Sequence, residues 1–170
     1  MEDFKTDNIQ FKEVQQFRQG WLWTLLVFGS LVSILLPLVL ALQETKNRKE
    51  ALWTVAGVFG LQLINLSLFY ITKLETVISN KGVYYRWRPF FKRFTFLDAK
   101  EIATVESIPW TNTNWGFSKT KKFGRAHTVS GNRGVLIQMK DGRKYYIGSQ
   151  QALSMQMNCE KIMTDPLKYA

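Results

Sequence analysis

"WLWTLLVFGSLVSILLPLVLAL", at Trp21–Leu42, contains no ionisable residue over 22 positions. As a helix this stretch is ~33 Å long, enough to cross a hydrocarbon core of roughly 30 Å. A second run, "ALWTVAGVFGLQLINLSLFYIT" at Ala51–Thr72, has the same length and again carries no charge. The two runs predict a transmembrane helical hairpin at 21–42 and 51–72, and a soluble helix pair is the alternative.

Charge predicts how this hairpin is oriented. Residues 73–170 carry 17 Lys or Arg against seven Asp or Glu, an excess of ten that equals the net charge of the whole chain. Basic residues flanking the hairpin on the side of the two termini outnumber Lys46, Arg48 and Lys49 in the connector. Segments rich in Lys and Arg next to transmembrane helices remain in the cytoplasm. We therefore expect a multi-pass protein of the cell (plasma) membrane with both termini in the cytoplasm.

The residues before the hairpin are expected to form an interfacial segment. Glu2, Asp3, Asp7 and Glu13 argue against a cleaved signal peptide, which begins with a basic region. In "FKEVQQFRQG" the apolar residues recur at helical spacing, as Phe11, Val14 and Phe17. The sequence therefore predicts that residues 1–20 contain an amphipathic helix at the headgroup level.

Small and polar residues within the spans are expected to pack the two helices. In an antiparallel hairpin Gln62 lies at the depth of the serines of the first span, and two glycines allow close approach there. The residues are Ser30, Ser33, Gly57, Gly60, Gln62 and Asn65. We expect the two amides to hydrogen-bond across the pair or to a second copy of the chain. A substrate path is the alternative, although no ionisable side chain supports an ion route.

From Lys73 onward the pattern has period two, which is typical of strands. "LETVISNKGVYYRWR" reads as strand, turn, strand, and Pro89 ends the second strand because it lacks a donor. "VLIQMKDGRKYYIG" predicts a two-residue hairpin of the primed type at Asp141–Gly142. "SQQALSMQMNCEKIM" predicts a helix with Ser149 as N-cap. Its apolar stripe would be Ala152, Met155, Cys159 and Ile162. The expected domain, residues 73–165, has about seven antiparallel strands closed by this helix.

Three stretches resemble a known family. They are "FKEVQQFRQGWLW", "TVISNKGVYYRWRPFFKRFTFLDAKEI" and "HTVSGNRGVLIQMKDGRKYYIGSQ". This pattern is similar to that of small two-span bacterial pleckstrin-homology-like (PH-like) membrane proteins over residues 11–163. The resemblance implies a PH-like barrel capped by a C-terminal helix, and it implies no activity. The first hairpin turn offers only Lys81, so inositol phosphate binding, known from eukaryotic members of the fold, is not implied.

Residues for catalysis are sparse. His127 is the only histidine and Cys159 the only cysteine, and we expect both to be structural. A single thiol forms no disulfide framework, and no spacing of ligands predicts a metal or another cofactor. We therefore expect a protein that is not an enzyme.

Basic residues form the candidate binding surface. They are Arg86, Arg88, Lys92, Arg93, Lys119, Lys121, Lys122 and Arg125. Beneath a bilayer they would attract anionic lipid headgroups, and Phe117 and Phe123 would reach the headgroup layer. A protein partner, nucleic acid stacked on the aromatics, and a merely solvated face are the rival readings. An accessory subunit that docks into a larger membrane complex through the hairpin, or a homo-oligomer, is the alternative function.

Overall fold

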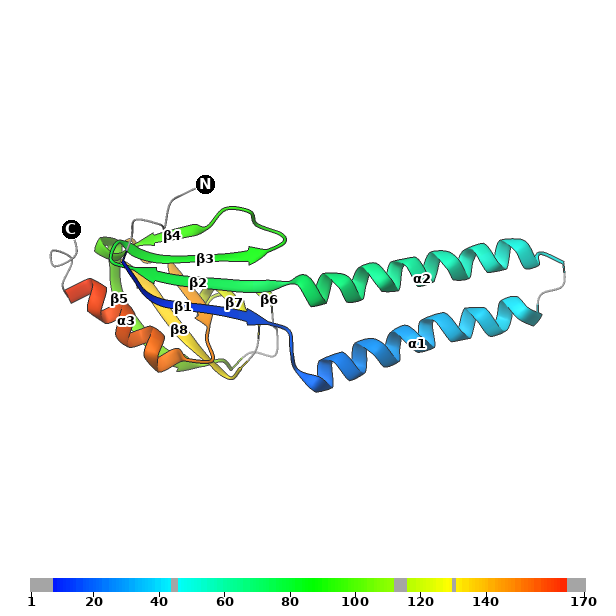
Figure 1. Cartoon of the computed structure of the whole chain (residues 1–170). Helices are drawn as coiled ribbons and strands as arrows, with labels where there is room; N and C mark the ends of the chain where they lie inside the picture. The colour runs from blue at the N-terminus through cyan, green and yellow to red at the C-terminus, as the bar shows by residue number, and fades with distance from the viewer. Residues whose placement is uncertain (1–7, 44–45, 112–115, 130, 165–170) are drawn as a thin grey trace. The chain divides into compact units, whose positions relative to one another are not determined.

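The computed structural model describes residues 8–43, 46–111, 116–129 and 131–164 (Figure 1). It divides into two compact units, of which the helical unit is Phe17–Ile71. The β unit combines the described residues before it, up to Gln16, with those from Thr72 onward. The expected segments 1–7 and residue 165 lie outside the described residues.

The helical unit is an antiparallel pair, α1 (Gly20–Gln43) and α2 (Arg48–Ile71), as expected from the two uncharged runs (Figure 1). Both helices are long and apolar enough to cross a membrane. Their large side chains are turned outward, with Leu25 at 62%, Phe28 at 67% and Leu36 at 61% exposure. Such an apolar surface is unfavourable in water and favourable in hydrocarbon, which favours a bilayer over a soluble helix pair.

One expected contact between these helices is confirmed. The Ser30 hydroxyl donates a hydrogen bond to Gln62 Oε1 at 3.0 Å. The Ser33 hydroxyl instead donates to the Gly29 carbonyl of its own helix at 2.7 Å. The close approach expected at Gly57 and Gly60 is wrong, because no atom outside the local backbone lies within 4 Å of where their Cβ atoms would be.

The segment before the hairpin is a strand, so the expected amphipathic helix is wrong for Ile9–Gln16 (β1). Phe11 and Gln15 are buried and Lys12 and Val14 are exposed, which is a period of two. The helix was predicted from the spacing of Phe11, Val14 and Phe17, but Phe17 does not belong to the strand. Its ring packs against Phe69 in the helical unit, with 5.7 Å between the ring centres.

Side chains of β1 also reach the far sheet. The Gln15 Nε2 donates to the Gly148 carbonyl at 2.6 Å. The Glu13 carboxylate accepts from the Gln150 N–H at 2.9 Å and from the Ser149 hydroxyl. Because Ser149 also accepts from the Gln151 N–H at 3.0 Å, β1 is tied to the turn that begins the C-terminal helix.

Sheet A has the order β1-β2-β3-β4 and is antiparallel throughout. Its other strands are β2 (Lys73–Ser79), β3 (Gly82–Arg88) and β4 (Thr95–Asp98). The β3 strand ends before Pro89, as expected. A 3₁₀ turn, η2 (Ala99–Glu101), leads to the second sheet.

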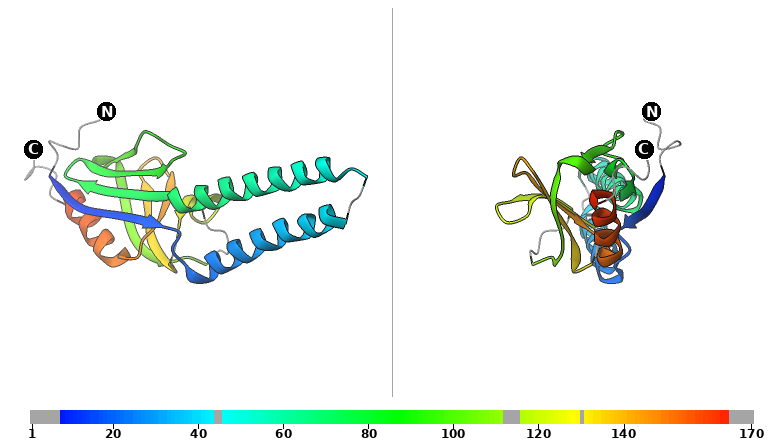
Figure 2. Two further views of the ribbon diagram at one scale, coloured as in Figure 1. Left: turned by 45° about the vertical axis from the view of Figure 1, so that its right-hand side comes forward. Right: turned by 90° about the vertical axis from the view of Figure 1, so that its left-hand side faces the viewer.

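Sheet B has the order β5-β8-β9-β7-β6 (Figure 2). Its strands are β5 (Ile102–Pro109), β6 (Gly116–Thr120), β7 (Gly124–Thr128), β8 (Arg133–Met139) and β9 (Lys144–Gly148). For the described residues from 73 onward the expected seven antiparallel strands are corrected to eight, to which β1 adds a ninth, and β7 pairs with β9 in parallel. The β6–β7 hairpin was not predicted, because polar, basic and apolar residues are mixed in this segment without a clear alternation of apolar and polar side chains.

The expected two-residue turn between β8 and β9 is also corrected. The Gly142 N–H donates to the Met139 carbonyl at 3.0 Å, and only Gly142 has a positive φ, of 85°. A type I′ turn needs positive φ at both central residues and a type II′ turn at the first, so Asp141, whose φ is not positive, excludes both. Instead the Asp141 carboxylate accepts from the Arg143 N–H at 2.9 Å.

The C-terminal helix α3 (Ala152–Thr164) packs against both sheets. Its expected stripe is confirmed, because Ala152, Met155, Cys159 and Ile162 are all buried. The Gln156 Oε1 accepts from the Ser107 N–H at 2.9 Å, so the helix also satisfies the outer edge of β5.

Candidate functional site

The β2–β3 register decides which basic residues remain available for binding. Glu75 lies directly opposite Arg86, and Lys73 lies opposite Arg88. The Glu75 carboxylate lies 2.6 Å from the Arg86 guanidinium, 3.5 Å from that of Arg88 and 3.4 Å from the Lys73 ammonium. Arg86 is therefore a structural residue rather than the free surface cation that the sequence predicted.

The ionised form of Glu75 is stabilised. Partial burial alone raises the pKa of Glu75, but the hydrogen bond and charge of Arg86, together with Arg88 and Lys73, lower the pKa below its ordinary value. Arg86 Nη1 also donates to the Lys92 carbonyl at 3.3 Å, and the guanidinium lies 4.0 Å from the centre of the Phe94 ring. This network fixes the connection between β3 and β4.

Glu75→Gln is expected to lower the free energy of unfolding of the β unit by about 2 kcal/mol, because it leaves the largely buried Arg86 guanidinium without its anion. Urea denaturation of the full chain in detergent measures this loss. The matched control is Arg88→Gln, which removes a half-exposed partner and is expected to cost under about 1 kcal/mol. Equal losses in the two variants would contradict the structural role of Arg86.

The same register places the β3–β4 connection at one particular end of sheet A. Only Thr72 separates the last residue of α2 from Lys73, the first residue of β2. Lys73 pairs with Gln16 on one side and with Arg88 on the other. The residues that follow Arg88 therefore lie at the end of the sheet where the chain passes to and from the long helices.

We call this end the proximal rim. It comprises the exposed residues Arg88, Phe90, Phe91, Lys92 and Arg93, with Phe117 of β6 beside them. The Phe91 and Phe117 rings lie 6.4 Å apart, which joins the β3–β4 connection to sheet B. Phe90 and Phe91 lie within the stretch at 76–102 that carries the family resemblance, but no role was predicted for either residue. The β2–β3 pairing places them at this end of the sheet.

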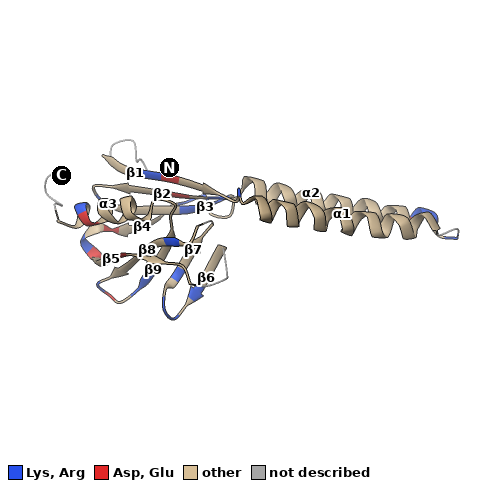
Figure 3. Cartoon of the chain, turned by 90° about the horizontal axis from the view of Figure 1, so that it is seen from below, with Lys and Arg blue, Asp and Glu red and all other residues tan. Residues whose placement is uncertain are grey.

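The remaining basic residues lie on the β6–β7 hairpin. Lys119 pairs directly with Arg125, and Lys121 and Lys122 form the turn between the strands. All four are exposed, and Figure 3 shows the blue of Lys and Arg on this hairpin. Like charges placed directly opposite each other destabilise a strand pair, so Lys119 and Arg125 favour an anionic partner.

Phe123 does not belong to this exposed surface, which corrects the expectation that it reaches the headgroup layer. It is 1% exposed and packs against Trp110 at 5.1 Å and Tyr146 at 5.2 Å. These rings form a small core on the outer face of sheet B, where the Tyr146 hydroxyl donates to the Ile108 carbonyl at 3.2 Å. Phe123 holds the basic hairpin against its sheet.

His127 and Cys159 are both buried, on β7 and α3 respectively. Burial raises the pKa of the Cys159 thiol to about 12, so the nucleophilic thiolate is absent at neutral pH. The His127 Nδ1 accepts a hydrogen bond from the Trp87 indole at 3.0 Å, and its ring packs against Tyr85 at 4.6 Å. Burial and then Arg125 lower the pKa of His127 to about 4.

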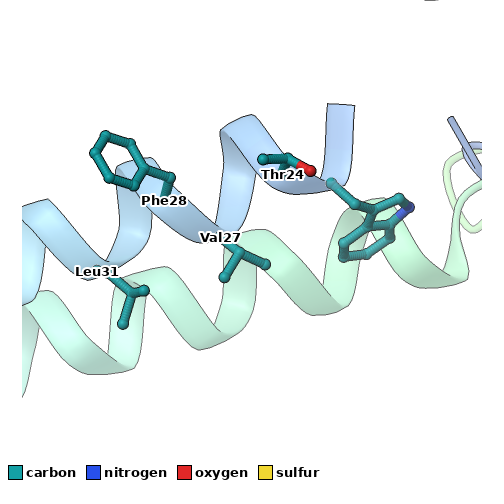
Figure 4. A pocket seen from close by; sticks show the side chains of 5 residues that line it. Thr24, Val27, Phe28 and Leu31 are labelled. Atoms are coloured by element: carbon teal, nitrogen blue, oxygen red, sulfur yellow. The ribbon is translucent and has the colours of Figure 1, made fainter. Parts of the chain in front are cut away.

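A groove of about 450 Å³ lies along one face of α1 (Figure 4). It is lined by Trp23, Thr24, Val27, Phe28 and Leu31, and Phe28 points away from α2. The Thr24 hydroxyl donates to the Gly20 carbonyl at 3.0 Å, which leaves an apolar lining suited to lipid chains. Among the described residues no three His, Cys, Asp or Glu side chains group as metal ligands.

Comparison of the chain with protein-family models, curated proteins and solved structures found no match.

Proposed function

We propose that this chain is a non-enzymatic, multi-pass protein of the cell membrane whose β unit binds anionic lipid headgroups of the cytoplasmic leaflet. The β unit would be a PH-like domain of the bacterial membrane type that the sequence resembles. The observation that carries the proposal is the proximal rim, where exposed cations lie beside the two residues that flank the long helices.

The β1–β2 pairing supports the placement of the rim. Gln16 precedes the helical pair, Lys73 follows it, and the two residues are cross-strand partners. If α1 and α2 both cross the bilayer, both flanks lie on one side, as this pairing requires. The excess of basic residues after residue 73 then favours the cytoplasmic side.

Electrostatics explains why lipid is the favoured ligand. Each Lys or Arg near an anionic leaflet gains about 1 kcal/mol, and the attraction falls off within a Debye length. The hairpin Lys119–Arg125 and the rim cations Arg88, Lys92 and Arg93 are exposed, whereas Arg86 is already neutralised. Nucleic acid is disfavoured, because all three aromatic side chains in "YYRWR" are buried in the β unit and cannot stack on bases.

The proposal predicts a lysine footprint on the full chain in nanodiscs. We expect Lys92, Lys119, Lys121 and Lys122 to react more slowly with an amine-acetylating reagent in anionic discs than in neutral discs. High salt should remove the difference, because it screens exposed charges. Mass spectrometry of the acetylated peptides measures the rates.

The control lysines are Lys81 and Lys100, which are exposed and lie at or near the opposite end of sheet A. They should react equally in both discs. Equal rates at all six lysines would overturn headgroup binding and would favour a protein partner for the basic surface.

A second candidate function, an accessory subunit that docks through the helical hairpin, is favoured by one observation. The side chain of Asn65 is exposed on α2 and has no hydrogen-bond partner in the described part of the chain. In hydrocarbon an unsatisfied amide costs free energy that a neighbouring helix recovers. The same side chain on a second copy both donates and accepts, so a homo-oligomer is the simplest docking.

Asn65→Leu tests this candidate by crosslinking in native membranes. We expect crosslinked oligomers of the unsubstituted chain to decrease several-fold in Asn65→Leu, since model interhelical amide bonds contribute about 1–2 kcal/mol. Gln62→Leu is the control, because Gln62 already bonds Ser30 within the hairpin. Recovery of the unsubstituted chain only as a monomer would exclude docking through Asn65.

A further inference from the structure

We infer that Phe90, Phe91 and Phe117 form an aromatic wedge that enters the boundary between headgroups and acyl chains beside the proximal rim. This inference rests on the proposed function and goes further, because it assigns the site a second ligand, the hydrocarbon of the leaflet. The basic residues would bind the headgroups, and the aromatic wedge would contact the acyl chains beneath them.

Exposure and clustering carry the inference. Phe90 is 58%, Phe91 52% and Phe117 62% exposed, and two of these rings are in contact although they come from different sheets. Single exposed aromatics are ordinary, but a group of three among cations is typical of surfaces that bind the membrane interface. Lys92 and Arg93 directly follow the two phenylalanines, so the charged groups can remain at the phosphates while the rings descend.

The wedge is held in place before any lipid binds. The Phe91 N–H donates to the Trp87 carbonyl at 2.7 Å, which closes the turn that presents both rings. Arg86 bonds the Lys92 carbonyl from within the Glu75 network. Phe117 packs on the buried His127 ring at 5.0 Å. A preformed surface loses less conformational entropy on binding than a flexible loop does.

Chain continuity identifies the bilayer as the occupant. Cross-strand partners have Cα atoms about 5 Å apart, so Arg88 lies one strand away from Lys73. Lys73 is two residues beyond α2, and Figure 1 shows the β3–β4 connection at the end of sheet A where β2 begins. Apolar side chains at a membrane interface are buried roughly 5–10 Å into the boundary between headgroups and acyl chains. If α2 spans the bilayer, the proximal rim lies close enough to its end for the three rings to reach this depth.

The test uses the full chain with an environment-sensitive fluorophore on Phe90→Cys, in nanodiscs that contain anionic lipid and a quencher on a shallow acyl carbon. Cys159 is fully buried and should stay unlabelled, which the unsubstituted chain checks. Lys81→Cys, in the turn at the opposite end of sheet A, is the matched control. We expect blue-shifted emission and roughly two- to threefold stronger quenching at position 90 than at position 81.

Equal quenching and equal emission at positions 90 and 81 would overturn the wedge. Phe117→Cys gives a second, independent label on the other sheet, and quenching there is expected as well. The lysine footprint in the same discs separates the two proposals. Footprint protection without quenching at either position overturns the wedge alone. Quenching with equal lysine reactivity in neutral and anionic discs supports the wedge and overturns headgroup binding.

Discussion

Gly124→Ala is expected to lower the free energy of unfolding of the β unit by more than about 3 kcal/mol and to release the β6–β7 hairpin. Gly124 has φ +66°, and a Cβ there would lie 2.1 Å from the Lys144 carbonyl oxygen of β9. That oxygen belongs to a backbone between two paired strands, so it cannot move aside without breaking the sheet. Amide hydrogen exchange of β7 and β9 in the full chain measures the loss.

Gly142→Ala is the matched control for this effect. Its φ of +85° is also left-handed, but no atom lies within 4 Å of the added Cβ. The substitution therefore carries only the conformational cost, about 1–2 kcal/mol. If both variants lost the same stability, the close approach of Gly124 to β9 would not be the cause. Because the hairpin carries Lys119, Lys121 and Lys122, Gly124→Ala should also abolish their protection in anionic nanodiscs.

Acid is expected to destabilise the β unit between pH 6.5 and about 4 through His127. The ordinary pKa of histidine is 6.5, and burial, then Arg125, lower the pKa of His127 to about 4 in the fold. The unfolded chain therefore takes up a proton first, and the stability present above pH 6.5 is lost as the pH falls through this window. The full loss is about 3 kcal/mol at pH 4.

The physical reason is that the buried imidazole of His127 would lose the hydration of its positive charge if it took up a second proton. Its Nδ1 accepts from Trp87, so the single proton resides on Nε2, which has no partner among the described residues. Protonation would cost the Trp87 hydrogen bond between the two sheets as well as burying a charge near Arg125.

Urea denaturation at pH 7 and pH 4.5 tests this, with His127→Gln as the control. Glutamine can still accept from Trp87 but does not titrate, so its stability should change far less between the two pH values. Glu75 and Asp141 have pKa values below their ordinary 4.5 and 3.8, so their contributions are lost mainly at lower pH. Parallel pH profiles for the two proteins would show that His127 is not the titrating group.

The features predictable from sequence were those encoded by neighbours along the chain. Uncharged run length predicted both long helices, and period two predicted β2, β3, β8 and β9. Helical spacing predicted the stripe of α3. Matching depths in an antiparallel pair predicted the Ser30–Gln62 hydrogen bond, because helix rise alone relates the two positions.

The features that sequence reasoning missed depend on partners distant in sequence. β1 is a strand because β2, some 60 residues later, offers an edge and Gly148 accepts from Gln15. Phe123 resembled an interfacial residue beside Lys121 and Lys122, but Tyr146 and Trp110 bury it. In the sequence Arg86 could not be distinguished from the exposed basic residues near it, because only the pairing of β2 with β3 shows that Glu75 lies opposite it.

In the sequence, the two helices α1 and α2 lie between β1 and β2, which are neighbours in one sheet, and this order has a consequence for biosynthesis. β1 leaves the ribosome before either long helix, and its hydrogen-bonding partner follows only after both. The nascent strand must therefore remain without this partner until the second helix has been synthesised. A chain threaded through the translocation machinery an odd number of times would leave β1 and β2 in separate compartments, and the β unit would lack its first strand.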